Sequence, residues 1–100
     1  MITVRAQQPA PYIHADNRGL VLCNGPQCAF VPASQLRFAA ETFAIIAEEG
    51  RATRSQATHV VGGYRDGGEV TLYVGTQDQL LSVTVSEADF NAVREAIGAR

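Results

Sequence analysis

The sequence has 100 residues, the size of one domain, and 46 % of them are hydrophobic, as in a packed globular protein rather than a disordered chain. The formal net charge of −2 argues against a protein that coats DNA without selectivity, because such proteins are basic overall. No apolar run reaches the ~20 residues that a membrane-spanning helix needs, and residues 1–5 lack the apolar core of a signal peptide. We therefore expect residues 1–100 to form one cytoplasmic domain with no membrane contact.

The first half of the chain is predicted to contain three main strands and a helix. A short edge strand is expected at residues 2–5, before a lead-in whose prolines cannot complete a sheet ladder. The three main strands are expected at residues 12–15, 20–24 and 28–31. Apolar residues then recur at helical spacing, which predicts a helix over residues 34–49 with Ser34 as its cap.

The second half is predicted to repeat this order after a polar connector at residues 50–56. Apolar residues at every second position predict strands at residues 70–74 and 81–85, and an apolar run predicts another strand at residues 58–64. The Asp66-Gly67 pair between the first two of these strands is a strong hairpin signal. Ser86, with Asp89 three residues later, predicts the start of a closing helix.

The two halves are similar at a shift of 50 residues. Three identities then fall in strands and turns: Leu22 with Leu72, Gly25 with Gly75, and Gln27 with Gln77. A duplicated β-β-β-α unit, with half-repeats at about residues 10–50 and 57–100, is one explanation, and chance similarity is the other. In both cases we predict an α+β fold in which an antiparallel β-sheet carries two helices on one face.

The order of antiparallel strands followed by a helix resembles that of the Whirly proteins and of the related transcriptional coactivators that bind single-stranded DNA. Residues 81–97 are similar to the last strand and helix of those coactivators. Their basic motifs and Lys-rich segments are missing here, since all eight basic residues of the chain are arginines. The resemblance is one of topology, which by itself carries little weight for function.

Cys23 and Cys28 flank the predicted turn at residues 25–26, which would place them directly opposite each other on neighbouring strands. In a cytoplasmic protein two reduced thiols are the expected state, and a disulfide between them is the alternative. A zinc site is disfavoured, because four residues separate the thiols and the chain has only His14 and His59 to complete the ligand set.

No catalytic constellation is recognisable in the sequence. The serines at the predicted helix starts are explained as caps, the acidic residues lie along predicted helix exteriors, and neither glycine pair belongs to a phosphate-binding motif. We therefore predict a non-enzymatic protein with no cofactor and with no catalytic or metal-binding residue.

One face of the predicted sheet is free of helices. Aromatic and hydroxyl side chains are expected to point to this face, together with Cys23 and Phe30. Unpaired bases stack on such aromatic side chains, and arginines at the rim bind phosphates. We therefore predict a small regulator that binds single-stranded nucleic acid through this face and works as a homodimer or higher oligomer. The expected contact residues are Arg18, Arg51, Arg54, Tyr64, Arg65 and Tyr73.

The alternative is a protein-binding regulator or inhibitor, such as a protein of a mobile element or phage that acts on a host protein. Phe38 and Ile45 fall outside the main apolar stripe of the first predicted helix, beside its acidic face. If they are exposed, they mark a protein contact, whereas a covering loop would make them ordinary edge residues. A homodimer is compatible with both hypotheses.

Overall fold

The computed structural model describes residues 12–98, which form an α+β fold, as predicted. Within that range the helical elements are a 3-10 turn, η1 (Ala33–Gln35), and two α-helices, α2 (Leu36–Glu49) and α3 (Glu87–Gly98). The strands are β1 (Tyr12–Asp16), β2 (Gly19–Asn24), β3 (Gln27–Pro32), β4 (Arg51–Gln56), β5 (His59–Asp66), β6 (Glu69–Thr76) and β7 (Leu80–Ser86). Neither of these helices is long and apolar enough to cross a membrane. The strand predicted at residues 2–5 lies outside the described residues.

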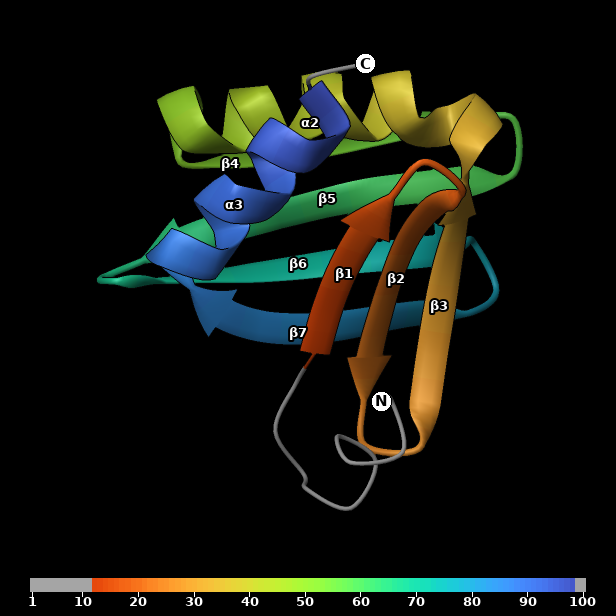
Figure 1. The fold of residues 1–100 in the computed structure, drawn as a ribbon, viewed down its shortest axis with the longest axis horizontal. Coiled ribbons are helices and arrows are strands. Elements are labelled where there is room, and N and C mark those ends of the chain that lie inside the picture. The colour runs from red at the N-terminus through yellow and green to blue at the C-terminus, as the bar shows by residue number, and fades with distance from the viewer. Residues whose placement is uncertain (1–11, 99–100) are drawn as a thin grey trace.

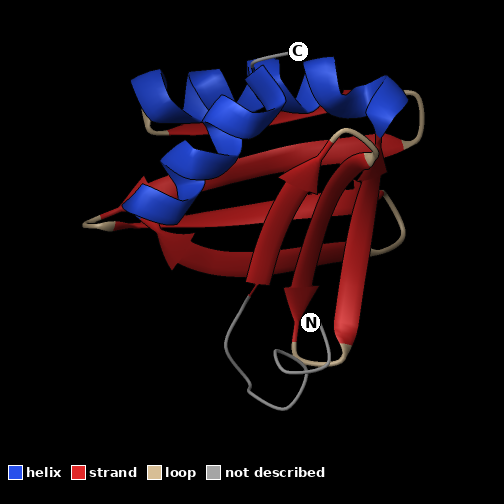
Figure 2. Cartoon of the chain, viewed as in Figure 1, coloured by secondary structure: helices blue, strands red, loops and turns tan. Residues whose placement is uncertain are grey.

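The described strands form two antiparallel sheets, where the sequence led us to expect one (Figure 1). One sheet has the order β1-β2-β3 and the other has the order β4-β5-β6-β7. The smaller sheet crosses over β6 and β7, while α2 packs on β4 and β5 of the larger sheet. Figure 2 shows that both helices lie together at one side of the strands. The period of a strand reveals which side chains share a face, but it does not reveal which strands pair, and this is why the second sheet was missed.

The polar connector predicted at residues 50–56 is wrong, because residues 51–56 form β4. Gly50 has a φ of 92° and its N–H bonds to the carbonyl of Ile46 at 2.9 Å, so α2 ends there and the chain reverses directly into the sheet. β4 then pairs along β5 from Arg51 opposite Tyr64 to Gln56 opposite His59. A polar strand is stable here because β4 is an edge strand. The second half thus has four strands before its helix and the first half has three, so the predicted duplication is not confirmed.

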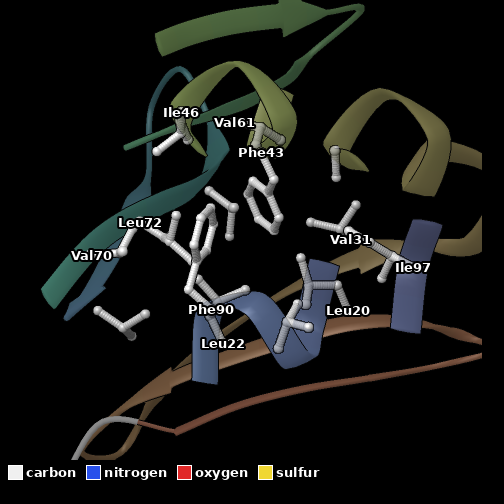
Figure 3. Packing of buried hydrophobic residues seen from close by; sticks show 14 of the residues in the cluster. Leu20, Leu22, Val31, Phe43, Ile46, Val61, Val70, Leu72, Phe90 and Ile97 are labelled. Atoms are coloured by element: carbon white, nitrogen blue, oxygen red, sulfur yellow. The ribbon is translucent and has the colours of Figure 1, made fainter. Parts of the chain in front are cut away.

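The core lies between the two helices and the inner faces of both sheets (Figure 3). Phe43 of α2 and Phe90 of α3 meet there, with ring centroids 5.7 Å apart and ring planes tilted by 57°. Burying each large apolar side chain contributes about 1.5–3 kcal/mol to stability. The buried strand residues around the two rings include Leu20, Leu22, Val31, Val61, Val70, Leu72, Val74 and Val83. These residues determine which face of each strand is turned inward.

The two helix caps predicted from the sequence have different outcomes. The backbone N–H of Asp89 donates to Oγ of Ser86 at 3.1 Å, so the cap of α3 is confirmed. Ser34 lies inside η1, and neither η1 nor α2 has a side-chain cap bond, so that cap is wrong. The 3-10 turn places Gln35, instead of a serine, at the residue that precedes α2.

Candidate functional site

The four-stranded sheet has one face packed on the core and one face turned to solvent. On β5, Val61 and Gly63 point inward, so Gly62 and Tyr64 point outward. The strand register then places Tyr73 of β6 on the same side, opposite Gly62. We call this side the outer face. It carries Arg51, Thr53, Ser55, Val60, Gly62, Tyr64, Thr71, Tyr73, Ser82 and Thr84.

Tyr73 is held in a defined orientation on the outer face. Its ring covers Gly62, where an added β-carbon would lie 2.5 Å from Cε1 of the ring. Its hydroxyl forms a hydrogen bond with Oγ1 of Thr53 on β4. Because Gly62 has no side chain, the ring can reach across β5 and connect β6 to β4. The outer face therefore presents a phenol ring whose position is set before any ligand arrives.

A hollow of about 470 Å³ opens beside this ring. We call it the tyrosine hollow. Its lining residues are Arg51, Ala52, Thr53, Gly63, Tyr64, Arg65 and Tyr73. Tyr64 stands at its side with 46 % of its surface exposed, opposite Arg51 in the strand register. A volume of this size is within the range of roughly 300–1,000 Å³ that is typical of small-molecule sites.

The chemical character of the outer face is aromatic and hydroxylic, with few charges. The side chain of Arg51 is exposed and pairs with no other residue in the described part of the chain. The hydroxyls of Thr71 and Thr84 bond to each other at 2.8 Å across β6 and β7. Asp66 and Glu69 face each other at the turn of the β5–β6 hairpin, two residues beyond Tyr64. Arg51 therefore brings a positive charge to the tyrosine hollow, and two carboxylates lie toward the same end of the sheet.

The six residues predicted to bind nucleic acid do not all meet. Arg51, Tyr64 and Tyr73 converge on the tyrosine hollow. Arg65 also belongs to the lining, but its guanidinium donates to the carbonyl of Ala47 at 2.9 Å and lies 3.9 Å from Glu87. The backbone of β5 alternates, so Tyr64 and Arg65 point to opposite faces of the sheet.

Arg54 and Arg18 are also directed elsewhere. Arg54 belongs to the inner side of β4, where it lies 3.6 Å from Glu41 and 5.2 Å from the ring centroid of Phe38. Arg18 is in the turn between β1 and β2, in the smaller sheet, and its guanidinium lies 3.3 Å from Asp16. Both arginines therefore stabilise the fold locally and lie away from the tyrosine hollow.

The two residues predicted as a protein contact differ in exposure. Phe38 is 6 % exposed, because Arg54 covers its ring, so it offers little surface to a partner. Ile45 lies seven residues further along α2, on the same flank of the helix, and it is partly exposed. This flank lies next to β4, since Arg54 of β4 contacts both Phe38 and Glu41.

Cys23 and Cys28 are directly opposed in the register of β2 and β3, as predicted, and their sulfur atoms are bonded. The expected pair of reduced thiols is therefore not what the structure shows. The disulfide and Phe30 lie on the smaller sheet, so neither belongs to the outer face, contrary to expectation.

A second hollow, of about 610 Å³, was not anticipated from the sequence. It lies between β3 and the turn that joins β6 to β7, and its most exposed apolar residues are Phe30 at 54 % and Leu80 at 49 %. These segments are 50 residues apart in the chain, so no local pattern could bring them together.

The tyrosine hollow, in contrast, could have been indicated by the sequence. Gly62 and Gly63 are adjacent in a predicted strand, and glycine in a strand often marks the close approach of another group.

No protein-family model, curated protein or solved structure matches this chain. Among residues 12–98, no group of three or more histidine, cysteine, aspartate or glutamate side chains could hold a metal ion. Function is therefore inferred from the geometry of the binding surfaces alone.

Proposed function

We propose that the chain is a non-enzymatic binding protein that holds an unpaired stretch of nucleic acid on its outer face. One observation carries the proposal: Tyr64 and Tyr73 line the same hollow as Arg51, whose guanidinium pairs with no described residue. An unpaired nucleotide offers a flat base and an anionic phosphate, and the tyrosine hollow has a complementary group for each.

The two tyrosines would play different parts in this binding. Tyr64 is the more accessible ring, and stacking one base on an aromatic side chain contributes roughly 1–3 kcal/mol. Tyr73 is already oriented by Gly62 and Thr53, so little conformational entropy is lost when a ligand meets it. The hydroxyls of Ser55, Ser82 and the Thr71–Thr84 pair extend the face with hydrogen-bonding groups that suit any base.

The distribution of charge predicts the mode of recognition. Arg51 is the only cation on the part of the outer face that the structure describes, and Asp66 and Glu69 lie toward the same end of the sheet, just beyond Tyr64. Stacking would therefore contribute more than phosphate contacts, and a duplex, whose bases are already stacked, would bind weakly. With one phosphate contact, we expect the logarithm of the binding constant to change with the logarithm of salt concentration by about −0.7.

Fluorescence anisotropy with a labelled single strand and its duplex tests the proposal. We expect Tyr64→Ala to weaken single-strand binding by at least about fivefold and Tyr64→Phe to preserve it, because phenylalanine keeps the stacking ring. Arg51→Gln is expected to weaken binding and to flatten its salt dependence. Arg37→Gln is the matched control, because Arg37 is an exposed arginine on α2, on the other side of the sheet. Equal binding of the duplex, or equal weakening by Arg37→Gln, would contradict the proposal.

A further inference from the structure

Among residues 12–98, β4 is an edge strand, and its outward backbone groups bond to no other described residue. The N–H of Arg65 donates to the carbonyl of Gly50 at 2.9 Å, which identifies this pair as a hydrogen-bonded one. Bonded and non-bonded pairs alternate along an antiparallel ladder, so Ala52, Arg54 and Gln56 bond to β5. The N–H and carbonyl groups of Arg51, Thr53 and Ser55 therefore point away from the sheet. All three residues are exposed.

Two glutamates that form no ion pair with a described residue lie beside this edge. Glu48 and Glu49 end α2, where the negative end of the helix dipole disfavours further negative charge. No basic residue occupies the last turn of α2, and neither glutamate forms an ion pair with another described residue. Gly50 connects Glu49 directly to β4, so these acids lie next to the start of the exposed edge. Arg65 already donates to the carbonyl of Ala47 at 2.9 Å, and a second cation at this point would further stabilise the end of the helix and its two glutamates.

We propose that two copies of the chain associate by antiparallel pairing of their β4 strands, around a two-fold axis at Thr53. Arg51 of each copy would then lie opposite Ser55 of the other copy. The three residues with free backbone groups would form three bonded pairs, or about six hydrogen bonds. The result is one continuous sheet of eight strands in which both outer faces point the same way.

The same register brings a second cation to the acidic end of α2. Ala52 of one copy would lie opposite Arg54 of the other copy, on the side of the sheet that carries α2. Because Ala52 follows Glu49 by only three residues, Arg54 of the second copy, which lies 3.6 Å from Glu41 of its own copy, would also come close to the acidic end of the first helix. The small side chain of Ala52 leaves room for it. The edge is thus complementary in charge to a second copy of itself.

The position of α2 fits this arrangement. Because α2 packs on both β4 and β5, its axis lies over the space between these two strands. In each copy the axis is therefore about half a strand spacing away from β4. Adding the spacing between the two β4 strands gives about 10 Å between the two α2 helices, the usual distance for packed helices. The flank that holds Ile45 would then be covered by the second copy, which accounts for a partly exposed isoleucine beside the edge.

A second copy fits the edge better than an unrelated peptide does. The strand Arg51–Gln56 is polar and its two arginines point to opposite sides of the sheet, so it lacks the apolar alternation that captures an extended peptide. If the pairing of the two β4 strands were shifted so that the two-fold axis passed through Arg54, the Arg54 side chains of the two copies would lie opposite each other. The register centred on Thr53 avoids this repulsion and uses every free backbone group.

Sedimentation of the protein without nucleic acid, from micromolar to millimolar concentration, tests this association. We expect a dimer that Ser55→Pro dissociates, because proline removes an outward N–H and blocks the edge. Ser82→Pro is the matched control: the carbonyl of Ser82 accepts a bond from Asn24 at 3.0 Å, so its backbone groups also point away from the neighbouring strand. Glu49→Lys is expected to raise the dissociation constant about tenfold, whereas Glu95→Lys, the same charge change at an exposed site on α3, leaves it unchanged.

Amide hydrogen exchange supplies a second readout. The N–H groups of Thr53 and Ser55 should exchange more slowly as the protein concentration rises, while those of Ala52 and Arg54 are protected at every concentration. A protein that is monomeric at every concentration would overturn the proposal. So would a dimer that Ser55→Pro and Glu49→Lys affect no more than their controls do. If Ser55→Pro does not fold, Glu49→Lys and the exchange of Thr53 decide the question.

Discussion

The ring of Tyr73 lies over Gly62, its partner in the register of β5 and β6. A β-carbon at Gly62 would fall 2.5 Å from Cε1 of that ring and 2.9 Å from the carbonyl oxygen of Ala52. The tyrosine thus occupies the space that a side chain on β5 would take, and its hydroxyl continues to Thr53. One glycine therefore allows an aromatic ring to link three strands of the outer face.

Replacing Gly62 with alanine is expected to displace the ring of Tyr73. The free energy of unfolding should fall by about 1–3 kcal/mol, the usual effect of overpacking, and can be measured by urea denaturation. Gly68→Ala is the control, because no atom lies within 4 Å of a β-carbon added there. A Gly62→Ala protein as stable as the Gly68→Ala protein would contradict the position of the ring.

The hydroxyl of Tyr73 can be removed without removing its ring. Tyr73→Phe is expected to lower the free energy of unfolding by about 0.5–1.5 kcal/mol, because the hydrogen bond with Thr53 is lost. A double-mutant cycle with Thr53→Val isolates the interaction, since the second substitution should add little once the first has been made. Strictly additive losses would show that the two hydroxyls do not interact.

Arg54 is expected to stabilise the fold mainly by covering Phe38. Its guanidinium carbon lies 5.2 Å from the ring centroid, and its ion pair with Glu41 is too exposed to contribute much. Thermal denaturation should show a loss of about 0.5–1 kcal/mol for Arg54→Ala. Arg54→Met should lose less, because methionine keeps the apolar stem. Equal losses in the two variants would assign the effect to the charge.

The two serines near the helix starts should respond differently to alanine. Ser86→Ala removes the acceptor for the N–H of Asp89 and is expected to destabilise the protein by about 1 kcal/mol. Ser34→Ala is expected to change stability little, because η1 has no side-chain cap bond. Chemical denaturation of both variants compares them directly, and a larger loss for Ser34→Ala would contradict the observed start of α2.

The pKa of Asp16 is lowered from its usual value of 3.8, first by the backbone N–H of Arg18, which donates to Oδ1 at 2.8 Å. The Arg18 guanidinium and His14 act in the same direction. Stability from this carboxylate is thus present above the unfolded pKa and is lost as pH falls through the lower folded pKa. NMR titration should place the pKa of Asp16 below 3.8, and Asp16→Asn should remove this part of the acid sensitivity. A pKa at or above 3.8 would contradict the turn geometry.

Local features of the fold could be read directly from the sequence. The apolar run at residues 58–64 and the alternation at residues 70–74 correctly identified the strands of Tyr64 and Tyr73, and the pair Ser86 and Asp89 correctly located the start of α3. The turn after Asn24 also placed Cys23 opposite Cys28. These features depend on neighbouring residues only, because hairpin turns and helix caps are formed by groups a few residues apart.

The tertiary structure alone decided which faces meet. The division into two sheets and the burial of Phe38 under Arg54 both depend on contacts that no local pattern specifies. Arg54 and Arg65 therefore looked like candidates for the binding surface, although in the folded chain they bind Glu41 and the end of α2. The physical reason is that packing of the core selects which face of a strand is buried, and this choice assigns each charged side chain to a partner or to solvent.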